Sequence, residues 1–234
     1  LLTIHSSVKV INYPLKKSYD QITIKDKQEL KNLIYRNINI GLGVDSAMIS
    51  VTKDHVYSLD DQRIINSIIK TSKLTLDFLF DNKQLNFDEI FVFNGRVSHF
   101  NAVVQFCRKQ NINYNIFEIV SNKSKYLLLK NSTPHDKHLF SKQLIAAWDK
   151  SNNKNKIKIG ESFFNKNQHS NIKENNEIDY SSFQKKGKIP QKILNQREII
   201  SIFGSSRNET ESVEGWENNF LNGDDEEIIF EICN

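Results

Sequence analysis

Cysteine, proline and long apolar runs are scarce in this sequence. Its 234 residues include 2 cysteines and 3 prolines. Cys107 and Cys233 lie far apart and match no metal-ligand spacing, so we expect no disulfide framework, and Cys107 falls on the apolar face of a predicted helix. The apolar runs are only a few residues long, far short of the ~20 needed to cross a bilayer. Because no signal-peptide pattern opens the chain either, the expected location is the cytoplasm.

The composition is that of a folded chain. Hydrophobic residues make up 38% and charged residues 26%, and this hydrophobic share exceeds that of disordered chains. A chain of this length suits one large or two small domains, and folding buries roughly 70% of the surface that the unfolded chain exposes. The formal net charge of +4 is by itself weak evidence for an anionic partner.

The charges are unevenly distributed along the chain. From Lys150 to Arg197 there are eleven Lys or Arg residues and four acidic residues, whereas every charged residue after Arg207 is acidic. The basic stretch is rich in Asn and looks irregular, which is typical of an interdomain linker, a lid or a mobile loop. We therefore predict a first domain at 1–150, a basic linker or lid at 151–197, and the start of a second domain at 198–234.

A strand–helix–strand pattern predicts the fold class. Residues 89–93 form an apolar run typical of a buried strand, 97–109 carry apolar residues at helical spacing, and 114–120 form the next strand. Short connections between such elements are typical of the right-handed crossover of a parallel sheet. The predicted class is therefore α/β, with further helices at 59–82 and 134–150. The apolar residues of the helix at 134–150 are expected to face the core.

Asn94, Gly95 and Arg96 stand at the predicted junction between this strand and this helix. Asn-Gly normally marks a two-residue hairpin, but no second strand follows directly. Ligands of open α/β sheets bind at the carboxyl ends of the strands, where helix N–H groups favour anions. Gly95 permits a positive φ, and Arg96 offers a planar fork for a carboxylate or phosphate. The three residues are candidates for substrate binding; the alternative is that Arg96 pairs with an acid and the loop only connects.

Glu118 ends the next predicted strand, so it should open onto the same edge of the sheet. A carboxylate in this place can act as a base, bind a sugar hydroxyl or hold Arg96. Pairing with the arginine is the common structural outcome. The sequence leaves a site role and a structural role for Glu118 equally open.

Gly204, Ser205, Ser206 and Glu209 repeat this arrangement at the start of the second predicted domain. Gly204 lets the backbone approach a ligand, and the two serines supply hydroxyl and N–H donors at a helix start. Glu209 falls where a capping-box acid would lie if Ser206 is the cap. Capping accounts for Ser206 and Glu209 but does not require the other two residues, so phosphate binding is the other interpretation.

Two further patterns are weaker. Gly41 and Gly43 interrupt an apolar run and predict a turn or a close backbone approach, since a lone Gly-x-Gly does not define a phosphate loop. His135 and His138 lie three apart on one predicted helix face, but no third ligand has recognisable spacing. The site is therefore expected to hold no metal.

The succession of motifs across residues 89–220 resembles the bacterial capsule and surface-carbohydrate biosynthesis glycosyltransferases. It runs from a strand ending in Phe-Asn-Gly-Arg and a strand ending in Glu, through a TPHD segment, to YSSFQKKGKIP, IFGSSRNE and GWENNF. The resemblance implies a GT-B arrangement of two Rossmann-like domains, with the acceptor mainly on the first and the nucleotide-sugar donor mainly on the second. It also implies that Arg96 and Glu118 lie on the acceptor side, whereas Ser205, Ser206 and Glu209 begin the donor side.

On this resemblance, the expected function is transfer of a sugar from a nucleotide-sugar donor to a cell-surface polysaccharide of the capsule or O-antigen type. The acceptor would be a glycan or lipid-linked glycan, and no metal or other cofactor is implied. Arg96, Ser205 and Ser206 are candidates to bind the anion, and Glu118 is the candidate base. Because the chain begins at Leu1 and ends directly after an amphipathic segment, we expect both termini to be cut ends.

The expected partners follow from the same features. The basic stretch suits acidic lipid or a partner domain, so peripheral contact with the cytoplasmic face of the inner membrane is compatible with it. No nucleic-acid-binding module is recognisable, and no nucleic acid is expected. Two alternatives stay open: a non-catalytic α/β binding or assembly domain, in which Arg96 pairs with Glu118, and a nucleotide-sugar epimerase.

Overall fold

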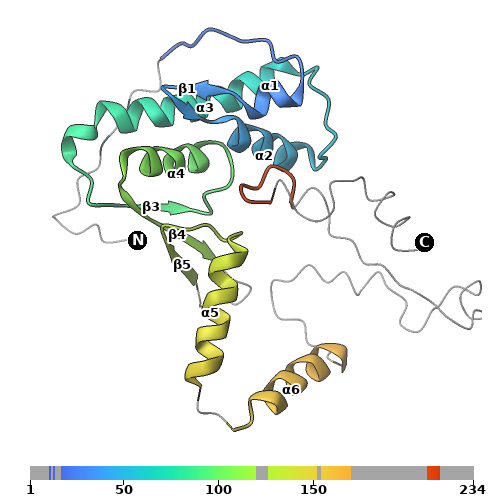
Figure 1. Cartoon of the computed structure of the whole chain (residues 1–234). Helices are drawn as coiled ribbons and strands as arrows, with labels where there is room; N and C mark the ends of the chain where they lie inside the picture. The colour runs from blue at the N-terminus through green and yellow to red at the C-terminus, as the bar shows by residue number, and fades with distance from the viewer. Residues whose placement is uncertain are drawn as a thin grey trace, which may run out of the picture.

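Helices, a three-stranded sheet and a two-stranded hairpin are the regular elements of the described part of the chain (Figure 1). The computed structural model describes residues 11, 13, 17–119, 126–151, 154–169 and 210–216. The predicted site residues Gly204, Ser205, Ser206 and Glu209 lie outside these ranges. The fold below is therefore mainly that of the first predicted domain.

Helices and strands alternate only around residues 89–119, and elsewhere elements of one type follow each other. In order, the elements are α1 (Lys27–Lys31), β1 (Ile34–Tyr35), β2 (Ile38–Asn39), α2 (Gly41–Thr52), α3 (Gln62–Asp81), a short 3-10 helix (Lys83–Leu85), β3 (Glu89–Phe93), α4 (Ser98–Gln110), β4 (Asn113–Ile119), β5 (Tyr126–Lys130), α5 (Lys137–Lys150) and α6 (Lys156–His169). The long helix predicted at 59–82 is confirmed as α3, whose N-cap is Asp61. None of the helices within the described ranges has the length and apolar character needed to cross a membrane.

The predicted strand–helix–strand unit is confirmed. β3 and β4 pair in parallel, with Phe93 opposite Phe117, and α4 connects them. β5 pairs antiparallel with β4, so the three-stranded sheet is mixed and not fully parallel as predicted. The reason is the connection: residues 120–125 are too few for a parallel crossover, which needs about a dozen or more. The chain is a mixed α/β protein, and its sheet is compatible with a Rossmann-like fold without being specific to it.

α4 packs against one face of the sheet, and α3 packs on α4 (Figure 1). Val104 on α4 and Ile116 on β4 are both fully buried in this layer. Cys107 is buried there too, as predicted, and burial raises the pKa of its thiol to about 11. The core therefore lies between the sheet and the α3–α4 layer.

Gly43 explains how α2 joins this core. A Cβ at Gly43 would lie 2.7 Å from the Cβ of Asn101 on α4, and one at Gly41 would lie 2.1 Å from the carbonyl oxygen of Leu30. Both contacts are closer than side chains allow. The predicted close approach is confirmed, although the glycines begin a helix and do not form a turn.

The prediction that the helix at 134–150 faces the core is wrong. No residue of α5 is buried, and Leu144 and Trp148 are 74% and 53% exposed. α5 runs away from the sheet, and α6 lies at its far end (Figure 1). Leu144, Ile145 and Trp148 of α5 therefore lie at the surface, and Trp148 contacts Lys156 of α6. α6 also shows that part of the stretch predicted to be irregular is helical.

A buried carboxylate joins the N-terminal segment, the β1–β2 hairpin and α3. Asp77 is 3% exposed and accepts hydrogen bonds from the Tyr19 and Tyr35 hydroxyls at 2.7 and 3.0 Å. Arg36 Nε donates to it at 2.6 Å, and Lys17 Nζ lies 3.3 Å away. Burial alone would raise the pKa of Asp77, but these hydrogen bonds outweigh it and hold the pKa below its usual value.

We expect Asp77→Ala to lower the free energy of unfolding by ~3 kcal/mol, because several donors would lose a buried acceptor. Asp77→Asn should also change how the free energy of unfolding depends on pH. Since the folded pKa is lowered, the ionised carboxylate stabilises the fold above its unfolded pKa of ~3.9, and this contribution is lost as the pH falls through the folded pKa. Urea unfolding across this acid range measures both effects. The exposed residue Asp88 provides matched Ala and Asn controls, and equal losses at the two positions would contradict the prediction.

Candidate functional site

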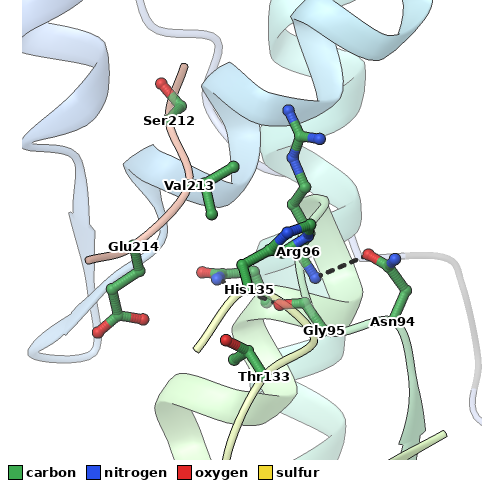
Figure 2. Close-up of a pocket in the computed structure, with 9 residues that line it drawn as sticks. Asn94, Gly95, Arg96, Thr133, His135, Ser212, Val213 and Glu214 are labelled. Atoms are coloured by element: carbon green, nitrogen blue, oxygen red, sulfur yellow. Dashed lines mark hydrogen bonds between the residues drawn. The ribbon is translucent and has the colours of Figure 1, made fainter. Parts of the chain in front are cut away.

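The Asn94–Arg96 turn lies at the carboxyl end of β3, as predicted. Asn94 and Gly95 have φ values of 57° and 77°, the left-handed region that Asn and Gly tolerate best. Asn94 Oδ1 accepts a hydrogen bond from the Arg96 backbone N–H at 3.1 Å, drawn as a dashed line in Figure 2. The N-cap of α4, Val97, supplies no side-chain acceptor. The first N–H groups of α4 are thus left without a capping side chain at this edge.

Arg96 and Glu118 do not pair with each other. Arg96 Nε donates to Ser46 Oγ at 2.7 Å, and a second guanidinium nitrogen donates to the Glu211 carbonyl oxygen at 3.4 Å. Glu118 instead accepts a hydrogen bond from Asn94 Nδ2 at 2.6 Å. The direct Arg96–Glu118 pair of the structural alternative is absent among the ion pairs of the described residues.

Two polar atoms at the same edge are buried without a hydrogen-bond partner: Asn101 Oδ1 and His135 Nε2. Asn101 lies in the first turn of α4 and is 6% exposed, and its Nδ2 donates to the Gly95 carbonyl at 3.4 Å. His135 lies just before α5, and its carbonyl accepts a hydrogen bond from Trp216 Nε1 at 2.7 Å. Leaving a buried polar atom unpaired costs ~1–3 kcal/mol. Such atoms are rare in native proteins, and a water, an ion or a ligand that binds there is one explanation for them.

Electrostatic interactions link His135 to the predicted site residues. Burial lowers the pKa of His135 and the charge of Arg96 lowers it further, whereas the charge of Glu118 raises it. The net pKa lies below the usual value, so the imidazole is neutral at pH 7. A neutral imidazole has one ring nitrogen that accepts a proton. Three successive segments of the chain thus supply a cation, a carboxylate and a neutral base.

Residues 210–216 close one side of the site and come from the acidic C-terminal part of the chain. The Ser212 hydroxyl donates to the carboxylate of Asp45, which is fully buried on α2. Glu211 Oε1 lies 2.5 Å from Lys31 Nζ, which also lies 3.8 Å from Asp45 Oδ2. Figure 1 shows this segment in red beside α2. These contacts fix a segment of the predicted second domain against the first.

Two pockets adjoin each other beside His135. The first lies between the Asn94–Arg96 turn, the 133–135 segment and residues 212–214 (Figure 2), and its volume of about 20 Å³ holds about one water. The second has a volume of about 250 Å³, slightly below the ~300–1,000 Å³ of pockets for drug-sized ligands. Thr133, His135 and Glu214 line both. His135 therefore lies at the border between a narrow pocket and a wider one.

Sequence reasoning missed the two residues that carry the unpartnered atoms. Asn101 was treated only as part of a helix, and His135 was considered only as a metal ligand. The signal available for His135 was its position in the TPHD segment, between a strand and a helix that follow Glu118. Within the described residues, no group of three or more His, Cys, Asp or Glu is placed to hold a metal ion.

Comparisons of the chain with protein-family models, curated proteins and solved structures find no match. The resemblance to glycosyltransferases therefore rests on the succession of motifs alone. The geometry of the two pockets is an independent basis for inferring function.

We expect the pKa of His135 to respond in opposite directions to two substitutions. Arg96→Gln should raise it, because a nearby positive charge is removed, and Glu118→Gln should lower it, because a nearby negative charge is removed. NMR titration of the imidazole measures both changes. Lys70→Gln removes an exposed charge on α3 and serves as the control, which should leave the value unchanged. Shifts of the same sign in Arg96→Gln and Glu118→Gln would show that these charges do not act on His135.

Proposed function

We propose that this chain is part of a glycosyltransferase that moves a sugar from a nucleotide-sugar donor to a capsule- or O-antigen-type acceptor glycan. The observation that carries the proposal is the pair of unpartnered buried atoms, Asn101 Oδ1 and His135 Nε2, beside Arg96. They lie at the carboxyl edge of a parallel strand pair, where α/β proteins bind their ligands. The motifs that resemble the surface-carbohydrate glycosyltransferases pass through the same residues.

Sugar transfer requires three groups at the reacting centre. The anomeric carbon develops positive charge, the leaving phosphate develops negative charge, and the acceptor hydroxyl must lose its proton. In our proposal Arg96 and the N-terminal end of α4 offset the charge of the leaving phosphate. Ser205 and Ser206 are proposed to bind the same phosphate from the donor side.

In this proposal His135 is the base, and Glu118 supports it. The Glu118 carboxylate already accepts a hydrogen bond from Asn94, whereas His135 Nε2 has no partner. His135 Nε2 takes the proton of the acceptor hydroxyl while the hydroxyl oxygen bonds to the anomeric carbon. The bond from that carbon to the phosphate oxygen breaks, and its electron pair leaves with the nucleotide. The negative charge of Glu118 then stabilises the imidazolium.

The wider pocket is the place proposed for the acceptor sugar. Amide, hydroxyl and carboxylate groups line it, including those of Asn131, Ser132 and Asp136. Such groups donate and accept hydrogen bonds to sugar hydroxyls. Because His135 borders this pocket and the narrow one, an acceptor bound there would present a hydroxyl to the unpartnered Nε2.

The two alternatives gain less from the described contacts. The non-catalytic domain was expected to use an Arg96–Glu118 pair, and these residues instead contact Ser46, Glu211 and Asn94. No observation favours the epimerase. The GT-B arrangement of two Rossmann-like domains and the donor-side roles of Gly204, Ser205, Ser206 and Glu209 belong to the proposal, since these four residues lie outside the described ranges.

We expect His135→Gln in the full-length protein to lower kcat for sugar transfer by about 100- to 10,000-fold, the usual contribution of a general base. KM should change little, because glutamine keeps the size and polarity of the side chain. The acid limb of the pH–rate profile should disappear in this variant and shift to lower pH in Glu118→Gln. Transfer is assayed with a panel of nucleotide sugars and oligosaccharide acceptors, and donor binding is followed by calorimetry with nucleoside diphosphates.

His55→Gln, at a histidine outside both pockets, is the matched control and should keep wild-type kcat. Ser205→Ala, Ser206→Ala and Arg96→Gln should weaken binding of the nucleoside diphosphate. Absence of nucleotide binding across the whole panel would contradict the transferase. Turnover in His135→Gln with an unchanged pH profile would contradict only the assignment of the base.

A further inference from the structure

α5 and α6, here called the arm, extend outside the body formed by the sheet and the other helices. Figure 1 shows α5 leaving the sheet and α6 lying at its far end. No residue of α5 is buried, although the helix is as long as a typical core helix and contains Leu, Ile and Trp. α5 therefore presents side chains to its surroundings along most of its length.

An apolar stripe runs along α5. Phe140, Leu144 and Trp148 recur at i, i+4 and i+8, which places them on one face of a helix. Leu144 is 74% exposed, and the neighbouring Ile145 is 58% exposed. On α6, Ile157 is 71% exposed. Several large apolar side chains exposed on neighbouring turns of a helix favour interaction with another molecule or a membrane.

The same arm is strongly basic. Residues 137–169 contain seven lysines, against two acidic residues, Asp149 and Glu161. One of these lysines, Lys156, lies at the junction of the two helices: its Nζ is 4.8 Å from the centroid of the Trp148 ring and donates to the Trp148 carbonyl. Cationic and apolar groups are thus interleaved where α5 meets α6.

We propose that the arm docks on the anionic surface of a lipid bilayer. Helices that bind at the bilayer interface combine exposed Leu, Phe and Trp with lysines, and Trp prefers the headgroup region. Lysine stems can lie along the apolar boundary while their ammonium groups reach the phosphates. Each lysine near an anionic leaflet strengthens binding roughly fivefold. The charge of the arm and its apolar stripe therefore match one and the same partner.

A second copy of the chain fits this surface less well. Two arms packed symmetrically through the same face would bring lysines of one copy against lysines of the other, and like charges repel. The cores of protein interfaces are also depleted in lysine. An anionic lipid surface has the opposite charge and no defined shape to match. The inference does not depend on the proposed transferase activity.

The two tryptophans of the chain provide the test, since one lies on the arm and the other in the body. In the full chain, Trp216→Phe leaves Trp148 as the only tryptophan, and Trp148→Phe leaves Trp216; excitation at the long-wavelength edge of tryptophan absorption avoids the tyrosines. On adding vesicles of phosphatidylcholine and phosphatidylglycerol, we expect the emission of Trp148 to shift to the blue and that of Trp216 to stay constant. Vesicles of phosphatidylcholine alone should leave both spectra unchanged.

Charge variants test the electrostatic part. The triple variant Lys154→Gln, Lys156→Gln and Lys158→Gln should weaken binding to the anionic vesicles roughly 100-fold, about fivefold for each lysine. The control is a second triple variant that removes three exposed lysines of the body: Lys25→Gln, Lys70→Gln and Lys83→Gln. It has the same net charge as the first variant and should weaken binding much less.

Four results would overturn the proposal. The first is an unchanged Trp148 spectrum with anionic vesicles, and the second is equal binding to neutral and anionic vesicles. The third is a blue shift of Trp148 that needs no vesicles and grows with protein concentration, since this result would assign the stripe to a second copy of the chain. Equal losses in the two triple variants would likewise contradict docking through the arm.

Discussion

The close contact beneath Gly95 is the constraint on which the site depends. A Cβ at this position would lie 2.3 Å from Ile116 Cδ1 and 3.2 Å from Val104 Cγ2, and the backbone has a φ of 77°. Only glycine meets both conditions without displacing the core. The end of β3 and the start of α4 are thereby held tightly against β4, and the positions of Arg96 and Asn101 follow from this contact. The turn is a rigid base for polar groups.

Some buried polar groups of the molecule have hydrogen-bond partners, whereas others have none. Asp77 accepts several hydrogen bonds, and Asp45 holds Ser212 from the far end of the sequence. By contrast, Asn101 Oδ1 and His135 Nε2 stay unpaired although both atoms are buried. Local violations of hydrogen-bond satisfaction in an otherwise consistent fold are typical of functional sites. This contrast within one molecule is the reason for placing the site here.

The sequence predicted those features that depend on neighbouring residues. Periodicity located β3, α4 and β4, and Asn-Gly located the turn with positive φ. The features that depend on distant contacts had no local signal: Arg96 contacts Ser46 and Glu211, which lie 50 and 115 residues away. The direction of β5 depends on the length of residues 120–125, and the exposure of α5 depends on which elements reach it. Helical spacing alone predicted a buried face there because a stripe of apolar residues looks the same in a core and at a surface.

The central claim is that the unpartnered atoms beside Arg96 bind a ligand of sugar transfer. NMR spectra of the side-chain amide of Asn101 test it directly, with the side-chain amide of Asn111, just beyond the other end of α4, as an internal reference. The account predicts that nucleotide sugars or oligosaccharide acceptors shift the Asn101 signal, together with the His135 imidazole, and leave Asn111 unchanged. If no member of either panel shifts Asn101 or His135, or if all asparagine amides shift equally, the claim is contradicted.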